Sequence, residues 1–261
     1  IGVDLGGTKI STAISTIEGN ILANVVLPTK AEEGEAAVLG RIVQSIDEVI
    51  VGSSTSIDEI EAIGIGSPGP LDAKKGIIIT TPNLPFKNYN LVQPLKEKYN
   101  IPVYLDNDAN AAAIGEYMFG AGKGKNSIVY FTVSTGVGGG AVLDGKVYRG
   151  HTSNALEIGH TTVDPNGPRC NCGNLGCLEA MSSGTAIAKK GKEAVSTNVE
   201  TSLKKHDTVT SYEVFKEAEA GDEVAKDIID NALTYLGIGV ANAIATFDPE
   251  MIIIGGGVSK A

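Results

Sequence analysis

The sequence predicts an α/β protein that consists of two related domains, and three observations support this. The chain has 261 residues, which is enough for one or two domains with large cores. Strand-like and helix-like segments alternate along it, as in a partly parallel sheet. The order strand, Gly-rich turn containing Thr, strand, Gly turn, strand occurs at 4–21 and again at 128–147. We therefore expect two α/β domains, 1–108 and 109–261, that face one another across a cleft.

Composition narrows the class of protein further. Hydrophobic residues make up 42% and charged residues 20% of the chain, which is ordinary for a soluble globular protein. The net charge of -10 argues against a surface made for nucleic acid or for anionic membranes. There is no continuous apolar run of membrane-spanning length and no signal peptide, so we expect a soluble cytoplasmic protein.

The elements of the first domain follow from local patterns. Residues 1–4 read as a buried strand, and the alternating residues 9–17 and 21–27 as a hairpin. Apolar residues at helical spacing predict an amphipathic helix over 31–51. The remaining expected elements are a buried strand at 60–66, a helix at 91–99, a strand at 103–105 and a helix at 108–119.

The second domain repeats this outline. We expect a strand at 128–133, a turn at 134–140, a hairpin at 141–147, helices at 184–195, 211–220 and 223–246, and a last strand at 251–254. The segment 196–210, rich in Ser, Thr and Lys, reads as a solvated loop without a recognisable motif. Because the chain stops just after a Gly-rich turn, we expect a further C-terminal helix beyond it.

Four soft ligands lie close together in the middle of the chain. His160, Cys170, Cys172 and Cys177 fall within eighteen residues, and these three cysteines are the only ones. One imidazole and three thiolates make a tetrahedral set typical of structural zinc. A disulfide scaffold is less favoured because three cysteines cannot all pair, and buried thiols without metal are the plainer alternative. We interpret 157–179 as a zinc-binding segment.

Three glycine turns follow three predicted strands. The first contains Asp4, Gly6, Gly7, Thr8 and Lys9, the second Thr135, Gly136 and Gly138, and the third Gly255, Gly256 and Gly257. Such turns can aim backbone N–H groups at phosphate oxygens, and Asp4 can reach a magnesium ion directly or through water. The first turn lacks the P-loop spacing, and by itself it would read as a plain hairpin. Together the three favour a nucleotide cleft.

A set of motifs in order along the whole chain resembles one known family. They are DLGGTK at 4–9, G-x-G-x-P-G at 64–69, the Asn-Asp-Ala-Asn run at 107–110, STGVGGG at 134–140, EIGH at 157–160, C-x-C-G-x2-G-C-L-E at 170–179 and IIIGGG at 252–257. They resemble the signature of the ROK family (repressors, open reading frames and kinases), and within it most closely the bacterial glucokinases.

The resemblance implies a two-domain fold of the actin and hexokinase (ribonuclease H-like) type with a structural zinc knuckle. It implies ATP with Mg²⁺ as cofactors and transfer of the γ-phosphoryl group to a hexose, with glucose as the first choice. It also suggests a homodimer or homotetramer. The family's catalytic base falls on Asp108; from the residues alone, Asp108 could equally be a helix N-cap, and Asp106 is a rival base.

The sugar-contacting positions are also implied by the resemblance. They are Gly66, Asn83, Asn107, Asp108, Glu157, His160 and Glu179. His160 would serve twice, since one ring nitrogen can bind zinc while the other donates to a sugar hydroxyl.

One position departs from the family pattern. Leu156 replaces the usual Gly before EIGH, and a bulky side chain there could trim the sugar pocket. A kinase of an N-acetylhexosamine or of fructose is therefore an alternative. Two others are a sugar-responsive repressor without its DNA-binding part and a non-catalytic sugar-binding or zinc module; the acidic charge balance favours the kinase over the repressor.

Overall fold

The computed structural model describes residues 1–81 and 83–260, and its contacts divide the chain into two compact units. The first unit comprises Ile1–Lys123 and Val147–Ala155, and the second Gly124–Lys146 and Leu156–Ala261. The sequence-based boundary after residue 108 differs from this division. The helix α3 (Asp108–Phe119) belongs to the first unit, because it packs on strands β4 (Ile63–Ser67) and β8 (Val103–Asn107).

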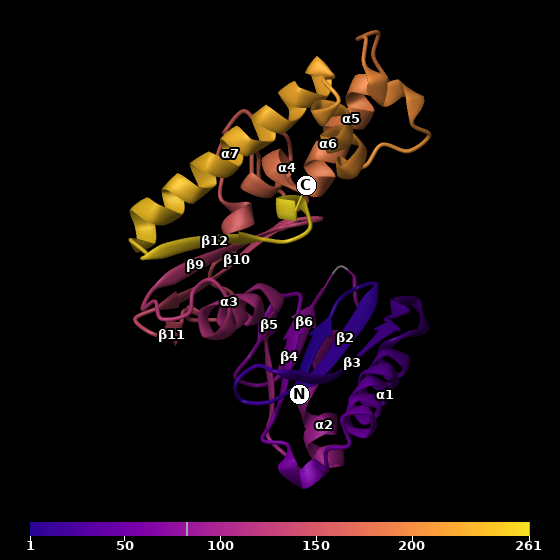
Figure 1. The fold of residues 1–261 in the computed structure, drawn as a ribbon, viewed down its shortest axis with the longest axis vertical. Helices are drawn as coiled ribbons and strands as arrows, with labels where there is room; N and C mark the ends of the chain where they lie inside the picture. Colours follow the sequence, from indigo (N-terminus) through magenta and orange to yellow (C-terminus); the bar gives the residue numbers. More distant parts are fainter. Residues whose placement is uncertain (82, 261) are drawn as a thin grey trace. The chain divides into compact units, whose positions relative to one another are not determined.

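The first unit is built on a five-stranded mixed sheet in the order β3-β2-β1-β4-β8 (Figure 1). Its N-terminal strands are β1 (Gly2–Leu5), β2 (Lys9–Ser15) and β3 (Ile21–Pro28). β1 pairs with β2 and β2 with β3 in antiparallel fashion, whereas β4 is parallel to β1 and to β8. The predicted strand, hairpin and parallel strands are confirmed.

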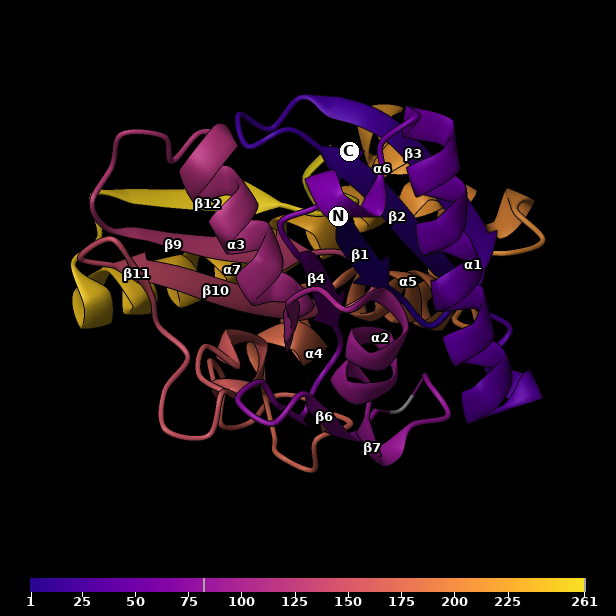
Figure 2. The same cartoon turned by 90° about the horizontal axis from the view of Figure 1, so that it is seen from below.

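Helix α1 (Glu35–Ser53) covers β2 and β3 with one apolar face (Figure 2). Val38, Ile42, Ile46 and Val49 recur every three or four residues and are fully buried. Each such side chain contributes about 1.5–3 kcal/mol when it leaves water, far more than the helix propensity of one residue. A buried hydrogen bond of 2.7 Å between Thr12 and Ser45 joins helix and sheet. Burial of the stripe therefore explains why 35–53 is helical.

A second, smaller sheet of the first unit was not predicted from the sequence. It contains β5 (Leu71–Asp72), β6 (Ile77–Thr80) and β7 (Lys87–Asn90), and helix α2 (Val92–Tyr99) follows it. Leu71, Ile78 and Phe86 are buried in the same core as the main sheet. The strands have two to four residues, too short for alternation to be read.

The second unit repeats the topology of the first. Its sheet has the order β11-β10-β9-β12, formed by β9 (Ile128–Val133), β10 (Val137–Leu143), β11 (Lys146–Val147) and β12 (Met251–Gly255). β9 and β10 are antiparallel, and β12 is parallel to β9, as β4 is to β1. The predicted internal repeat is thus confirmed at the level of topology.

The second unit also carries four α-helices among its described residues. They are α4 (Leu178–Ser182), α5 (Gly184–Val195), α6 (Ser211–Glu219) and α7 (Glu223–Phe247). Side-chain oxygens cap the first turns of α5 and α7: Ser183 accepts from the N–H of Ala186, and Asp222 from that of Ala225. Short 3-10 helices cover Ala31–Glu33, Ile57–Glu59, Ile158–His160, Ser202–Lys205 and Val258–Lys260.

Helix α7 is, within 1–81 and 83–260, the one helix long and apolar enough by length and composition to cross a membrane. The sequence reading missed this property because polar residues such as Thr234 and Asn242 interrupt the apolar run. One such helix is weak evidence for a membrane span, since core helices pass the same test. α7 packs on α4, α5 and α6, and its C-terminal half contributes Ala243 to the core of the sheet.

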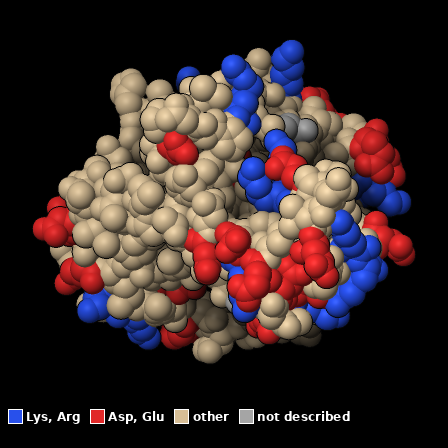
Figure 3. Space-filling view, turned by 90° about the horizontal axis from the view of Figure 1, so that it is seen from above, with Lys and Arg blue, Asp and Glu red and all other residues tan. Residues whose placement is uncertain are grey.

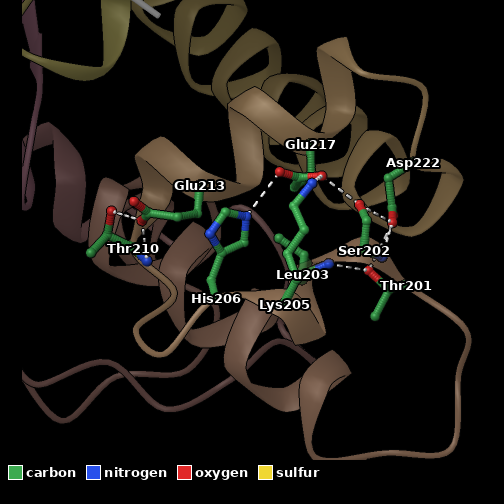
Figure 4. A network of polar contacts seen from close by, with 9 residues as sticks. All are labelled: Thr201, Ser202, Leu203, Lys205, His206, Thr210, Glu213, Glu217 and Asp222. Carbon is green, nitrogen blue, oxygen red and sulfur yellow. Dashed lines mark hydrogen bonds and ion pairs between the residues drawn. The ribbon is translucent and has the colours of Figure 1, made fainter.

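The segment 196–210 is more ordered than the solvated loop that we expected. Glu217 of α6 is buried, and its carboxylate binds Lys205 Nζ at 2.7 Å, His206 Nε2 at 2.8 Å and Ser202 Oγ at 2.6 Å (Figure 4). These bonds lower the pKa of Glu217 to about 2. Asp222 also accepts from Ser202, so two carboxylates fasten the segment to the helices.

The surface carries charges of both signs. On the face in Figure 3, Lys and Arg side chains are interspersed with Asp and Glu side chains. Local pairs such as Lys190 with Glu193 and Lys226 with Glu223, each three residues apart on one helix, contribute to this mixture.

Candidate functional site

The ends of three neighbouring strands bring three of the predicted residues together in the first unit. Asp4 of β1 is paired with Gly66 of β4, and Gly66 is paired with Asp106 of β8. Asp108 follows two residues later as the first residue of α3. A side chain at Gly66 would lie 3.3 Å from the Ala111 Cβ and 3.5 Å from the Asp108 Cα. Glycine at this position therefore allows α3 to start close against β4.

Asp106 has its hydrogen-bonding capacity taken up by the protein. Its Oδ2 accepts from Arg149 Nε at 2.7 Å, and its Oδ1 accepts from the backbone N–H of Asn107 and from Asn110 Nδ2. A carboxylate with these partners orders the turn between β8 and α3. This arrangement argues against Asp106 as the base.

Asp108 has a different environment. Its side chain is exposed, yet partial desolvation by the surrounding protein raises its pKa, and the nearby charge of Asp4 raises it further. A hydrogen bond of 2.8 Å from the Ala109 N–H opposes this rise in pKa. The net shift is upward, whereas a helix N-terminus alone would lower the pKa. A carboxylate with a raised pKa is a better proton acceptor near neutral pH.

The N-cap of α3 is Asn107 rather than Asp108. Asn107 Oδ1 accepts from the N–H groups of Ala109 at 2.8 Å and Asn110 at 3.3 Å. Capping, the plain alternative for Asp108, is thus carried out by its neighbour. This leaves the Asp108 carboxylate with one backbone N–H and room for a further partner.

The first glycine turn has the position that the sequence suggested. Gly6 donates to the Lys9 carbonyl at 3.0 Å, and Thr29 Oγ1 donates to the Gly6 carbonyl at 2.6 Å. A side chain at Gly7 would come within 2.6 Å of the Asn83 Cβ, so Asn83 lies directly on the turn. Thr8 closes the turn, and Lys9 is already the first residue of β2.

The second glycine turn is shorter than predicted, because β10 begins at Val137. Gly138 therefore lies in a strand, paired with Thr132, and not in a turn. A side chain at Gly139 would come within 2.6 Å of Ile158. The glycines of this strand thus permit close packing of the 3-10 helix Ile158–His160, which is a structural reason for the run.

The third glycine turn borders a cavity of about 600 Å³ in the second unit. Gly256 has φ of +98°, and a side chain there would come within 2.4 Å of the Val133 carbonyl oxygen. A side chain at Gly255 would contact the Tyr130 hydroxyl, so glycine is required for packing at both positions. Of the predicted nucleotide residues in this unit, Thr135 and Gly257 line the cavity.

Sequence reasoning missed most of the lining of this cavity. Ser134 of the predicted second turn also lines it, and the residues that were missed are Gly184, Thr185, Ala188, Lys189, Lys192, Thr210, Ser211 and Val258. Lys189 and Lys192 are three residues apart on α5, so they share one helix face. That spacing next to the capped start of α5 was visible in the sequence, but only the fold shows that the two lysines line the same cavity as Gly257.

The predicted zinc ligands converge in the second unit. The ligand atoms of His160, Cys170, Cys172 and Cys177 all lie within 4.8 Å of one another. His160 Nδ1 is 3.7 Å from Cys170 Sγ, and the Sγ atoms of Cys172 and Cys177 are 3.5 Å apart. These separations match a tetrahedral ion with bonds of about 2.0–2.3 Å to nitrogen and sulfur. The Cys3His donor set fits zinc, and Nδ1 is the ring nitrogen that faces the thiols.

The cysteines differ in how readily they ionise without a metal. Burial raises the pKa of the Cys177 thiol to about 12 and also raises that of Cys170. The backbone N–H of Asn174 lowers the pKa of Cys172, which is exposed. A divalent cation would offset the cost of two buried thiolates.

The remaining predicted sugar residues frame the cysteine cluster. Glu157 precedes the 3-10 helix that ends at His160, and Glu179 lies in the first turn of α4. Leu156 has φ of +64°, a conformation that favours glycine. Its side chain packs beside the core of the second unit and lines a separate cavity of about 240 Å³ with Phe247. The backbone therefore gives a reason for the usual Gly that does not involve the sugar.

Solved structures of other proteins share this fold. The ROK hexokinase of Thermus thermophilus superposes on this chain with a TM-score of 0.86 at 39% identity. The match covers 99% of this chain and 82% of the hexokinase chain. A ROK family glucokinase of Streptomyces griseus, solved with glucose and AMPPNP, gives 0.82 at 33% identity over 99% and 83% of the two chains. The α/β fold of the actin and hexokinase type is thereby confirmed.

The particular family is equally clear. The model of the ROK family matches residues 1–261, and the chain belongs to this family. It is 40% identical to a glucokinase of Halalkalibacterium halodurans over 266 residues, which cover 100% of this chain and 81% of that protein. A xylose repressor of Caldicellulosiruptor bescii is 34% identical over 98% of this chain and 65% of the repressor. The relatives of this chain thus include proteins named as glucokinases and proteins named as repressors.

Proposed function

We propose that this protein is an ATP-dependent sugar kinase that phosphorylates a hexose, with glucose as the preferred substrate. The observation that carries the proposal is the carboxylate of Asp108, with its raised pKa, beside Asp4 at the ends of three strands. The identity of 40% with a named glucokinase supports glucose as the first choice.

In this proposal Asp108 is the catalytic base. It accepts the proton of the sugar hydroxyl, whose oxygen forms a bond to the γ-phosphorus while the bond from that phosphorus to the bridging oxygen breaks and ADP leaves. Gly66, Asn83, Asn107, Glu157, His160 and Glu179 hold the sugar. His160 contributes Nε2 to this task, because its Nδ1 faces the cysteines.

The cavity of about 600 Å³ takes the nucleoside end against Gly257, with Lys189 and Lys192 available for phosphate charge. The turns at Gly6 and Gly136 bind phosphates through backbone N–H groups. Asp4 offers the hard oxygen ligand that Mg²⁺ prefers, and the bound ion would neutralise phosphate charge. Zinc, held by His160 and the three cysteines, would have a structural role.

Sugar-dependent ADP release from the whole protein tests the proposal. Glucose, mannose, fructose, N-acetylglucosamine and N-acetylmannosamine are compared at equal concentration, with a sugar-free reaction as the blank. We expect release with hexoses and the highest kcat/KM with glucose. Preference for an N-acetylhexosamine or fructose would replace the substrate but keep the kinase. No release with any sugar, together with sugar binding in calorimetry, would favour the repressor class.

We further propose a cytoplasmic protein that forms a homodimer or homotetramer. The support is the resemblance to the family. Light scattering on the eluate of a gel-filtration column measures the mass of the particle, and a mass of one chain would contradict the oligomer.

A further inference from the structure

We propose that Glu179 is a positioning residue for the second glycine turn, and that both ends of the zinc-binding segment hold Val137, the residue at which this turn ends. The inference rests on the proposed function, in which the turn at Gly136 binds phosphate and Glu179 contacts the sugar. The new element is that the carboxylate of Glu179 connects the phosphate-binding turn physically to the sugar-binding residues.

The first contact is a hydrogen bond. Glu179 Oε2 accepts from the backbone N–H of Val137 at 3.1 Å, where the turn ends and β10 begins. A side chain at Gly136 would lie 2.3 Å from the same oxygen. The carboxylate therefore lies directly on the turn, and only glycine at position 136 leaves it room.

The second contact is a close approach of two backbone segments. A side chain at Gly159 would lie 1.9 Å from the carbonyl oxygen of Val137. Gly159 immediately precedes His160, and Glu179 follows Cys177 by two residues. Val137 is thus held on its carbonyl side by one end of the zinc-binding segment and on its N–H side by the other.

This arrangement gives the metal ligands an effect on the phosphate turn. Zinc bound to His160 and Cys177 would fix the residues next to both contacts with Val137. The other oxygen of Glu179, Oε1, is 4.0 Å from Cys170 Sγ, so the carboxylate lies between the cluster and the turn. A sugar that orients Glu179 would also orient the Val137 N–H. The two substrates should therefore bind with positive and reciprocal coupling.

Calorimetric titration with Mg²⁺ and AMPPNP, in the absence of sugar, tests the positioning role. We expect Glu179→Ala to weaken nucleotide binding about tenfold, the effect of losing one charge-assisted hydrogen bond. Glu179→Gln should keep most of the affinity, since its amide oxygen can still accept from Val137. Gly136→Ala should weaken nucleotide binding as Glu179→Ala does, because the added methyl group displaces the carboxylate.

Glu157→Gln serves as the matched control, because Glu157 is a proposed sugar residue of the same segment. It should weaken sugar binding and leave the nucleotide Kd within twofold of wild type. If Glu179→Ala behaves like this control, with loss of sugar affinity alone, the positioning role is overturned. Zinc content and thermal unfolding are measured on every variant to show that each one folds.

Amide hydrogen exchange at Val137 tests the contact independently of kinase activity. Exchange should be faster in Glu179→Ala and in chelator-treated protein, and near wild type in Glu179→Gln. Unchanged protection of Val137 in Glu179→Ala would overturn the inference. If wild-type protein binds no nucleotide, the proposed function fails, whereas the exchange result still decides whether the contact holds the turn.

Discussion

Arg149 donates a hydrogen bond of 2.7 Å from its Nε to Oδ2 of Asp106, 43 residues earlier in the chain. The ion pair lies within the first unit, to which the segment Val147–Ala155 returns after three strands of the second unit. It assigns Asp106 to the support of the β8–α3 turn. The neighbouring Asp108 is the carboxylate that we propose for proton transfer.

Asp106→Asn should therefore lower stability more than it lowers activity. Asp106 is 14% exposed and accepts three hydrogen bonds, so we expect a loss of about 1–3 kcal/mol in the free energy of unfolding. Arg149→Gln, at a side chain that is 42% exposed, should cost less than about 1 kcal/mol. Urea unfolding measures both. A loss of turnover in Asp106→Asn as large as in an Asp108 variant would contradict the assignment.

Leu156→Gly should leave the order of sugar preference unchanged. The substitution removes the strain of a left-handed conformation, which costs about 1–2 kcal/mol for a residue with a Cβ. It also removes partly buried apolar surface, and the stabilisation lost with that surface is of similar size. The net change in stability should be within about 1 kcal/mol. A sugar panel of the variant measures specificity. A switch in the preferred hexose would show that Leu156 reaches the sugar after all.

The Glu217 cluster predicts a specific dependence of stability on pH. Because the pKa of Glu217 is lowered to about 2, its contribution is present above the ordinary carboxyl pKa and is lost as pH falls through about 2. Glu217→Gln should lower the Tm at pH 7, and the difference from wild type should shrink below about pH 4. Glu219→Gln, at an exposed residue of the same helix, is the control. A difference that is constant from pH 7 to pH 3 would contradict the ion pairs.

Metal analysis should find about one zinc per chain, as expected for one closed Cys3His set. Cys177→Ser should lose most of this zinc and unfold at a lower temperature, because a buried ligand is removed. Ser196→Ala, at an exposed residue of the same unit, should change neither property. Full stability of wild-type protein after exhaustive treatment with a chelator would argue against a structural metal.

Local patterns allowed part of this site to be predicted. The zinc ligands lie within eighteen residues, so their short-range spacing was enough to group them. The residues around Asp108 left a base and a helix N-cap equally open, and the choice of the base came from the resemblance to the family. Contacts between distant segments were not accessible in this way. The bond from Val137 to Glu179 spans 42 residues, and the close approach of Asn83 to Gly7 joins the connection between β6 and β7 to the first turn.

One prediction failed for a physical reason that the sequence conceals. A run of glycines after a strand is compatible with a phosphate turn and equally with a strand that another backbone approaches closely. In this protein Gly138 and Gly139 belong to the strand, and the close neighbour is the 3-10 helix that carries His160. Which of the two occurs depends on tertiary packing.

In the proposed reaction, Asp108 removes the proton from the sugar hydroxyl. The side chain of Asp108 is exposed, yet partial desolvation raises its pKa. Above the ordinary carboxyl pKa, the ionised carboxylate therefore makes the folded state less stable than the uncharged amide of Asn would. Asp108→Asn should therefore be at least as stable as wild type at pH 7. Any gain in stability should vanish as pH falls below the ordinary carboxyl pKa.

The most direct measurement is the rate of glucose-dependent ADP release by wild type and Asp108→Asn across pH. We expect wild-type kcat/KM to fall as pH is lowered through the raised pKa of Asp108. Asp108→Asn, folded and still binding glucose, should be slower by about 10²–10⁴-fold. An Asp108→Asn protein that turns over glucose at the wild-type rate would rule out Asp108 as the base.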